Sequence, residues 1–186
     1  LDASTANITS LAGLNKAVNL KNLYLYNNSY ISDIGPLSAL GALETLDLSG
    51  TKVADITALT GLNNLTKLNL SYHPLDDISP LSGLTNLTTL ILSITGLTDI
   101  SDLSALTKLS TLYIDSNQIS DISVLANMKA LVDLSLRYNQ IEDITALSSL
   151  TALKDLHLGS NQIRSLSPLV TNTGLSTEDT IYLDSN

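Results

Sequence analysis

The stretch Leu134-Ser-Leu136-Arg-Tyr-Asn139 is followed a few residues later by Asp143-Ile-Thr-Ala-Leu147-Ser-Ser-Leu150-Thr-Ala-Leu153, and the two phrases together decide the fold. In the first phrase Leu alternates with other residues, which is the period of a short strand with one side facing inward. In the second phrase Leu recurs at every third position, which suits a 3₁₀-like or irregular segment with one inward side. One strand and one non-strand segment, each with a single apolar side, are therefore predicted.

Both phrases recur along the whole chain at a nearly constant interval. Of the eight intervals between successive copies of the first phrase, six are 22 residues, one is 23 and the last is 25. Since a coil of this length is too short for a strand, two turns and a full α-helix, its back is expected to be 3₁₀ or extended. No coil can bury its Leu rows alone, so stacked coils are predicted to fold as a unit. The last position of each copy is Ala6, Asn28, Thr51, His73, Thr95, Asn117, Asn139, Asn161 or Asn186.

This pattern resembles the leucine-rich repeat family, and the 22-residue form with x-D-I-[ST]-x-L phrasing is similar to the repeats of bacterial internalins. The resemblance implies an α/β solenoid, a right-handed superhelix with a parallel sheet on its concave face and 3₁₀ or irregular segments on its convex face. Residues 1–186 would form a single domain of about eight to nine coils. Internalins begin with a helical cap and continue into an immunoglobulin-like region, so terminal caps are expected outside this segment. The absence of an initial Met also indicates a processed or trimmed piece.

The composition excludes several functional classes. The chain is 44% hydrophobic but only 4% aromatic, and it contains no Phe, Trp or Cys. Without Cys there is no disulfide scaffold, no thiolate metal site and no cysteine nucleophile. A net charge of −9 argues against binding to nucleic acid or to an anionic membrane, since both require clustered Lys and Arg. No apolar run approaches the length of about 20 residues that a membrane span needs, so no direct membrane insertion is expected.

Two polar columns of the repeat are interpreted as architecture. The Asn column is expected to bond the turn backbones of its own coil and the next, because an amide both donates and accepts hydrogen bonds. His73 breaks this column, and we expect a tolerated misfit that points to solvent; the alternative is a ligand surface beside Tyr72. The second column holds one Asp per coil, placed to accept backbone N–H groups as a cap, with Ser10 and Ser165 in the same place in the flanking coils. Its members are Asp33, Asp55, Asp77, Asp99, Asp121 and Asp143.

The sequence contains no residue pattern that indicates a catalytic site. The two His, His73 and His157, lie nearly four coils apart, or about 18 Å at the spacing of parallel strands, so they cannot form one acid–base pair. No glycine motif for phosphate binding is present. The chain is therefore predicted to be neither an enzyme nor a cofactor-binding protein, and no metal site is expected.

The outward strand positions and the adjoining sheet edge are left to carry function. Six of the seven Tyr fall in these columns, whereas no inward strand position is aromatic. Exposed Tyr offers contact area with a polar tip and is enriched in interface hot spots. Because nearby charges are mostly acidic, a partner with a basic or mixed surface is favoured. The predicted ligand-binding residues on the concave face are Tyr24, Tyr26, Tyr72, Ile91, Ile94, Tyr113, Arg137, Tyr138, His157 and Tyr182.

Three functional hypotheses follow for this face. The resemblance to internalins favours a recognition module of a secreted or cell-surface bacterial protein, with an adhesive or host-directed role, expected to be monomeric and to bind another protein or a glycan. The second hypothesis is an intracellular scaffold, similar to eukaryotic 22-residue-repeat regulators of a protein phosphatase. The third is a stalk that displays another domain. Fold alone does not choose among them.

Overall fold

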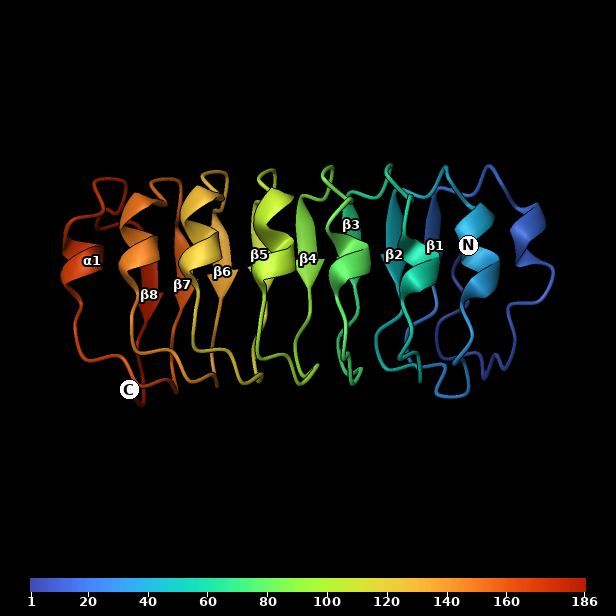
Figure 1. The fold of residues 1–186 in the computed structure, drawn as a ribbon, viewed down its shortest axis with the longest axis horizontal. Coiled ribbons are helices and arrows are strands. Elements are labelled where there is room, and N and C mark those ends of the chain that lie inside the picture. Colours follow the sequence, from blue (N-terminus) through green and yellow to red (C-terminus); the bar gives the residue numbers. More distant parts are fainter.

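The computed structural model describes residues 1–186 and consists of one parallel sheet with its eight strands in sequence order (Figure 1). Each strand is three residues long and contributes one inward side chain at its centre. An isolated bridge between Asp2 and Tyr24 extends the pairing to the first coil. The strands are β1 (Asn22–Tyr24), β2 (Thr45–Asp47), β3 (Lys67–Asn69), β4 (Thr89–Ile91), β5 (Thr111–Tyr113), β6 (Asp133–Ser135), β7 (Asp155–His157) and β8 (Thr180–Tyr182).

The register of the sheet places equivalent repeat positions side by side. Leu46 of β2 pairs with Leu23 of β1 and with Leu68 of β3, and the same row continues to Ile181 of β8. A slip of one residue would turn every inward Leu to solvent, so the hydrophobic pattern fixes this register. The outward residues consequently form straight columns that run along the solenoid.

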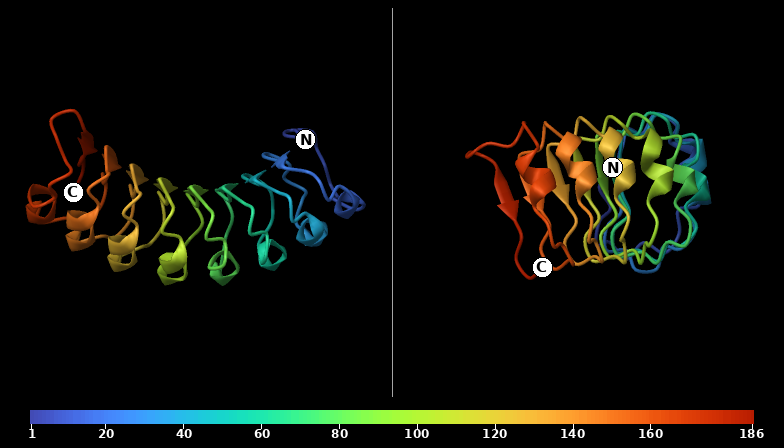
Figure 2. Two further views of the ribbon diagram at one scale, coloured as in Figure 1. Left: turned by 90° about the horizontal axis from the view of Figure 1, so that it is seen from above. Right: turned by 60° about the vertical axis from the view of Figure 1, so that its left-hand side comes forward.

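The back of each coil is mostly 3₁₀ helix, as the short repeat predicts. Figure 2 shows the molecule as an arch with the strands along the inner, concave side and the helical turns along the outer, convex side. The predicted solenoid fold is confirmed. The final, longer coil instead carries one α-helical turn, α1 (Ser167–Val170). The 3₁₀ segments are η1 (Leu14–Lys16), η2 (Gly35–Ala39), η3 (Thr57–Leu59), η4 (Ser79–Leu81), η5 (Ser101–Ala105), η6 (Ser123–Asn127) and η7 (Thr145–Ser149).

The core between sheet and helical turns is one continuous cluster of 47 buried residues, all of them Leu, Ile, Val or Met. No aromatic side chain belongs to it. Because each coil stacks the same aliphatic shape on its neighbour, the core extends along the arch without a break. None of the helical segments has the length and hydrophobicity that a membrane-spanning helix requires.

The Asn column forms a buried ladder that ties each coil to the one before it. Asn117 Nδ2 donates to the carbonyls of Leu92 in the preceding coil, at 2.9 Å, and of Ile114 in its own coil, at 3.0 Å. Its Oδ1 accepts from backbone N–H groups of Thr95 and Leu97 at 3.0 and 3.1 Å. Asn139 and its successors repeat the pattern. The structural role of the column is confirmed, but the bonds reach the preceding coil and not the next one.

The expectation that His73 points to solvent is wrong. Its side chain is fully buried within the ladder, where Nδ1 lies 2.8 Å from the carbonyl oxygen of Leu70. Nε2 lies 2.7 Å from the hydroxyl of Thr51, the ladder residue one coil earlier. Burial lowers the pKa of His73, and the contact with Leu70 opposes this shift only in part. The imidazole therefore replaces Asn because the neighbouring coil supplies a matching Thr.

The Asp column holds the backbone at the start of each helical turn. In every member Oδ1 accepts the N–H of the residue two positions later; for Asp55 this bond, to Thr57, is 2.8 Å long. The N–H donor stabilises the ionised carboxylate and lowers the pKa of Asp55. Ser10 and Ser165 accept the equivalent N–H in the flanking coils. The predicted capping role is confirmed.

Candidate functional site

The ten predicted site residues all lie on the outward columns of the sheet or along its edge, on the side that Figure 2 shows to be concave. We call this surface the concave face. Five of these side chains are partly buried between their neighbours, and the other five are exposed. The partly buried ones are Tyr24, Ile91, Tyr113, Arg137 and His157, and the exposed ones are Tyr26, Tyr72, Ile94, Tyr138 and Tyr182.

A tyrosine–carboxylate pair fixes the middle of the concave face. The Tyr113 hydroxyl at the end of β5 donates a hydrogen bond to Oδ2 of Asp133 at the start of β6. This bond, with partial burial, raises the pKa of Tyr113 to about 12. The phenol is therefore neutral at physiological pH, and its ring is held in one orientation. Asp155, next to Asp133 in the sheet register, is exposed and has no ion-pair partner.

Arg137 is held by an ion pair that crosses a neighbouring coil and by the ring of the next residue. Its Nη2 lies 3.2 Å from Oδ2 of Asp184, and its guanidinium carbon lies 5.6 Å from the centre of the Tyr138 ring. Gly159 lies between the two partner coils, and a Cβ there would come within 2.6 Å of the Asp184 carboxylate. The missing side chain thus lets this carboxylate settle over β7 and reach Arg137. The sequence predicted Arg137 as a site residue but not its ion pair with Asp184; the Gly in an otherwise outward column was the available signal.

The C-terminal end of the concave face carries an aromatic stack. The rings of His157 in β7 and Tyr182 in β8 lie 4.4 Å apart with an interplanar angle of 17°. The two residues are paired directly in the sheet register, which brings their rings over each other. Stacking of this kind limits the rotamers of both side chains and leaves a broad flat surface.

The N-terminal half of the face is less constrained. A shallow hollow of about 160 Å³ lies over β1 to β4, with Tyr24 and Ile91 among the residues that line it and Asp47 and Asn69 between them. No hydrogen bond joins the Tyr24 or Tyr26 hydroxyl to another residue. The predicted site residues thus share one face, and the ring stack and the cation–π contact that join some of them lie in its C-terminal half.

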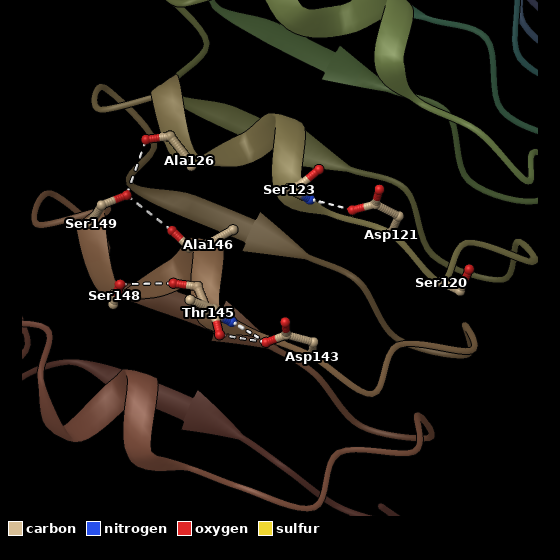
Figure 3. A pocket seen from close by; sticks show the side chains of 9 residues that line it. All are labelled: Ser120, Asp121, Ser123, Ala126, Asp143, Thr145, Ala146, Ser148 and Ser149. Atoms are coloured by element: carbon tan, nitrogen blue, oxygen red, sulfur yellow. Dashed lines mark hydrogen bonds between the residues drawn. The ribbon is translucent and has the colours of Figure 1, made fainter.

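A larger groove of about 670 Å³ lies on the opposite, convex side between η6 and η7, and Figure 3 shows the residues that line it. Its carboxylates, from Asp121 and Asp143, are occupied as caps by backbone N–H groups at 2.8 Å. Its hydroxyls also serve the backbone: Ser149 Oγ lies 3.0 Å from the carbonyl oxygens of Ala126 and Ala146. Small side chains at these positions create the space. Its carboxylates and the hydroxyls of Thr145, Ser148 and Ser149 already have hydrogen-bond partners, whereas the hydroxyls of Ser120 and Ser123 do not. The groove therefore adds no candidate site.

Comparison with known proteins supports the architecture. The model described as leucine-rich repeats (2 copies) matches residues 42–83, 85–127 and 129–171. The crystal structure of an internalin C2 from Listeria monocytogenes is 37% identical with a TM-score of 0.92, and the match covers 98% of this chain and 79% of that one.

The crystal structure of an internalin (inlF) from the same organism is also 37% identical, with a TM-score of 0.90. That match covers 97% of this chain but only 52% of the other, so the chain spans about half the length of that relative. No curated protein sequence gives a significant match. By its repeat matches and by its similarity to two solved internalins, the chain belongs to the leucine-rich repeat family and carries repeats of the internalin type.

Proposed function

We propose that the chain is a protein-recognition module of a bacterial protein that is secreted or attached to the cell surface, and that it binds its partner through the concave face. The observation that carries the proposal is the separation of aromatic from aliphatic residues. The core contains no aromatic residue, while Tyr residues collect on outward positions of the sheet. A fold that needs only aliphatic side chains gains little from Tyr at these positions, so their role lies outside the fold.

The geometry of the face favours recognition of a folded protein. Its C-terminal half is held in place by the pair of Tyr113 with Asp133, the ion pair of Arg137, and the stack of His157 on Tyr182. Side chains that are already ordered lose less conformational entropy on binding, which raises affinity for a partner of matching shape. Aromatic and Arg side chains in such settings are the usual hot spots of protein interfaces.

The charge of the face sets the kind of partner. Asp47, Asp115, Asp133 and Asp155 have no ion-pair partner on the concave face, whereas Lys67 is the one cation there outside an ion pair. A basic or mixed partner surface is therefore favoured, and an acidic one is repelled. The same charges steer association, so its rate should fall as salt is added.

The test is the double variant Tyr113→Ala with Tyr138→Ala. A partner is first captured with the intact chain from surface-exposed proteins, and its affinity for each chain is then measured by calorimetry. Affinity should fall at least tenfold because two hot-spot side chains are lost, which corresponds to about 1.4 kcal/mol or more. The thermal midpoint should change by less than about 4 °C, since both side chains lie outside the core.

A matched control places the same change off the face. Tyr30 is 61% exposed and lies outside the outward columns, so Tyr30→Ala should leave affinity unaltered. If the double variant binds as tightly as the original chain, the concave face is not the binding surface and the stalk hypothesis gains support. Determination of the natural N-terminus separates the secreted module from an intracellular scaffold, because a signal peptide is compatible only with the first.

A further inference from the structure

The edge of the concave face is built from residues in a strained backbone conformation. In each coil the residue before the ladder position has a positive φ, so the left-handed region is a demand of the turn and not of any one side chain. The backbone N–H of this residue continues the sheet ladder, as from Ile94 to Asp115 at 2.9 Å. The values run from 55° to 68° at Thr5, Asn27, Gly50, Tyr72, Ile94, Ser116, Tyr138, Ser160 and Ser185.

Few residue types suit this conformation. Gly has no Cβ to clash, and Asn is tolerated because its short side chain bonds locally, as at Gly50 and Asn27. A bulky or β-branched residue at positive φ is an outlier. By this rule Thr5, Tyr72, Ile94 and Tyr138 are the costly members of the column. The last three, with φ of 68°, 59° and 56°, carry large apolar side chains. Strain of this kind persists where the surrounding structure fixes the backbone, and it is concentrated at functional sites.

These three side chains are not buried in the core, so core packing does not offset the strain. Tyr72 is 62% exposed, Ile94 46% and Tyr138 55%, and none belongs to the buried cluster. They lie one and two coils apart in one column, so they form a row of apolar groups with separations of about 5 and 10 Å at the usual strand spacing. We call Tyr72, Ile94 and Tyr138 the edge row.

The surface beside the edge row indicates what it contacts. The carboxylates of Asp47, Asp115, Asp133 and Asp155 lie on the adjoining face without an ion-pair partner, and the whole chain has a net charge of −9. A partner segment that covers the row must supply apolar side chains, and its flank must carry Lys or Arg to match the carboxylates.

We infer that the edge row is the affinity-determining element of the concave face, and that it docks a protein segment with apolar side chains flanked by basic residues. This inference rests on the proposed function and specifies its partner. The fold bears backbone strain at these three turns so that large apolar side chains are presented to the partner.

The first arm of the test needs no partner. The triple variant Tyr72→Asn, Ile94→Asn and Tyr138→Asn places the residue best suited to positive φ at each turn, while Ser116→Asn with Ser160→Asn makes the same change at two turns without apolar side chains. Relief of strain offsets the partial burial that is lost, so the thermal midpoint of the triple variant should equal or exceed that of the original chain. A fall of more than about 4 °C would show that these side chains serve the fold.

The second arm measures binding with a phage-displayed random peptide library selected on the immobilised full chain. Recovered peptides should be enriched in Lys, Arg and apolar residues relative to the input library. They should bind the Ser116→Asn, Ser160→Asn control as they bind the original chain, and should bind the triple variant at least tenfold more weakly. Enrichment of Asp and Glu, equal affinity for the triple variant, or no recovery above background overturns the inference.

The same peptides separate this inference from the proposed function. The Tyr113→Ala, Tyr138→Ala variant of the proposed-function test changes Tyr138, which also belongs to the edge row, so it cannot separate the two proposals. The variant Tyr113→Ala with His157→Ala changes only the sheet surface and serves as the second probe. Binding that is lost in this pair but kept in the triple variant refutes the edge row alone. Binding that is kept in both refutes the concave face as well.

Discussion

Replacement of Asn117 by Ala should destabilise the chain strongly, although the residue is polar and its removal leaves the aliphatic core intact. Oδ1 of Asn117 accepts from the N–H groups of Thr95 and Leu97, and neither group has another acceptor. In the variant the carbonyl of Leu92 still accepts a hydrogen bond from the Thr95 hydroxyl, and that of Ile114 still accepts one from Asn139 Nδ2. Only the two N–H donors are therefore left without a partner.

The magnitude follows from these two orphaned groups. A buried N–H without an acceptor costs about 1–3 kcal/mol, so Asn117→Ala should cost about 2–6 kcal/mol. Domains of ordinary stability have about 5–15 kcal/mol in total. Urea unfolding followed by circular dichroism measures the loss, and an unchanged m-value confirms that the unfolded state is the same.

The last member of the ladder provides the matched control. Asn186 is exposed, and its single backbone donor, the N–H of Ile163, lies at 3.4 Å. Asn186→Ala should therefore cost less than about 1 kcal/mol. A loss below about 1 kcal/mol in Asn117→Ala, or one equal to that of the control, would mean that the ladder does not stabilise the joining of successive coils.

Three further changes test other parts of the structure. Because burial lowers the pKa of His73, the unfolded chain binds a proton first as pH falls below about 6.5, so stability should decline below that pH by up to about 1.4 kcal/mol per unit; His73→Asn should flatten this part of the urea-unfolding profile. In an ultraviolet titration one tyrosine should ionise at about 12, and that step should be absent from Tyr113→Phe. A Cβ at Gly174 would lie 2.0 Å from a backbone oxygen of the preceding coil, so Gly174→Ala should cost about 3 kcal/mol, whereas Gly83→Ala, with open space, should change stability by less than about 0.5 kcal/mol.

The fold was predictable because the repeat leaves little choice. A period of two in the strand phrase and a constant 22-residue interval put Leu46 beside Leu68 and Leu68 beside Leu90, and each such row must face inward to be buried. The caps were equally predictable, since an Asp before each helical turn has one local partner two residues later. Interactions that depend on a repeat position can be read from the repeat.

The burial of His73 was not predictable from its position in the repeat. His73 breaks the ladder in sequence, but it is buried because Thr51 stands one coil earlier with a hydroxyl at 2.7 Å. A prediction made residue by residue treats His as a poor replacement for Asn. His73 is tolerated in the ladder because its imidazole and the Thr51 hydroxyl fit each other, and this fit depends on the geometry between the two coils.

The candidate site was predictable in outline and not in detail. The outward columns follow from the alternation, and they place Tyr113 and Arg137 on the concave face. The pair of Arg137 with Asp184 joins residues 47 positions apart across Gly159, and the strain at Ile94 depends on backbone angles. The sequence signal for the ion pair is the small residue Gly159, and the positive φ at Ile94 is set by the turn of its own coil and not by its side chain.

A footprint of the tyrosines shows whether the inward residues build the fold while the outward residues bind. Mild iodination of the chain, free and in complex with a captured partner, is followed by mass spectrometry of each Tyr. Tyr72 and Tyr138 should be protected in the complex, while Tyr30, equally exposed but outside the face, should react as before. Protection of Tyr30 with unchanged labelling of Tyr72 and Tyr138 would contradict this prediction.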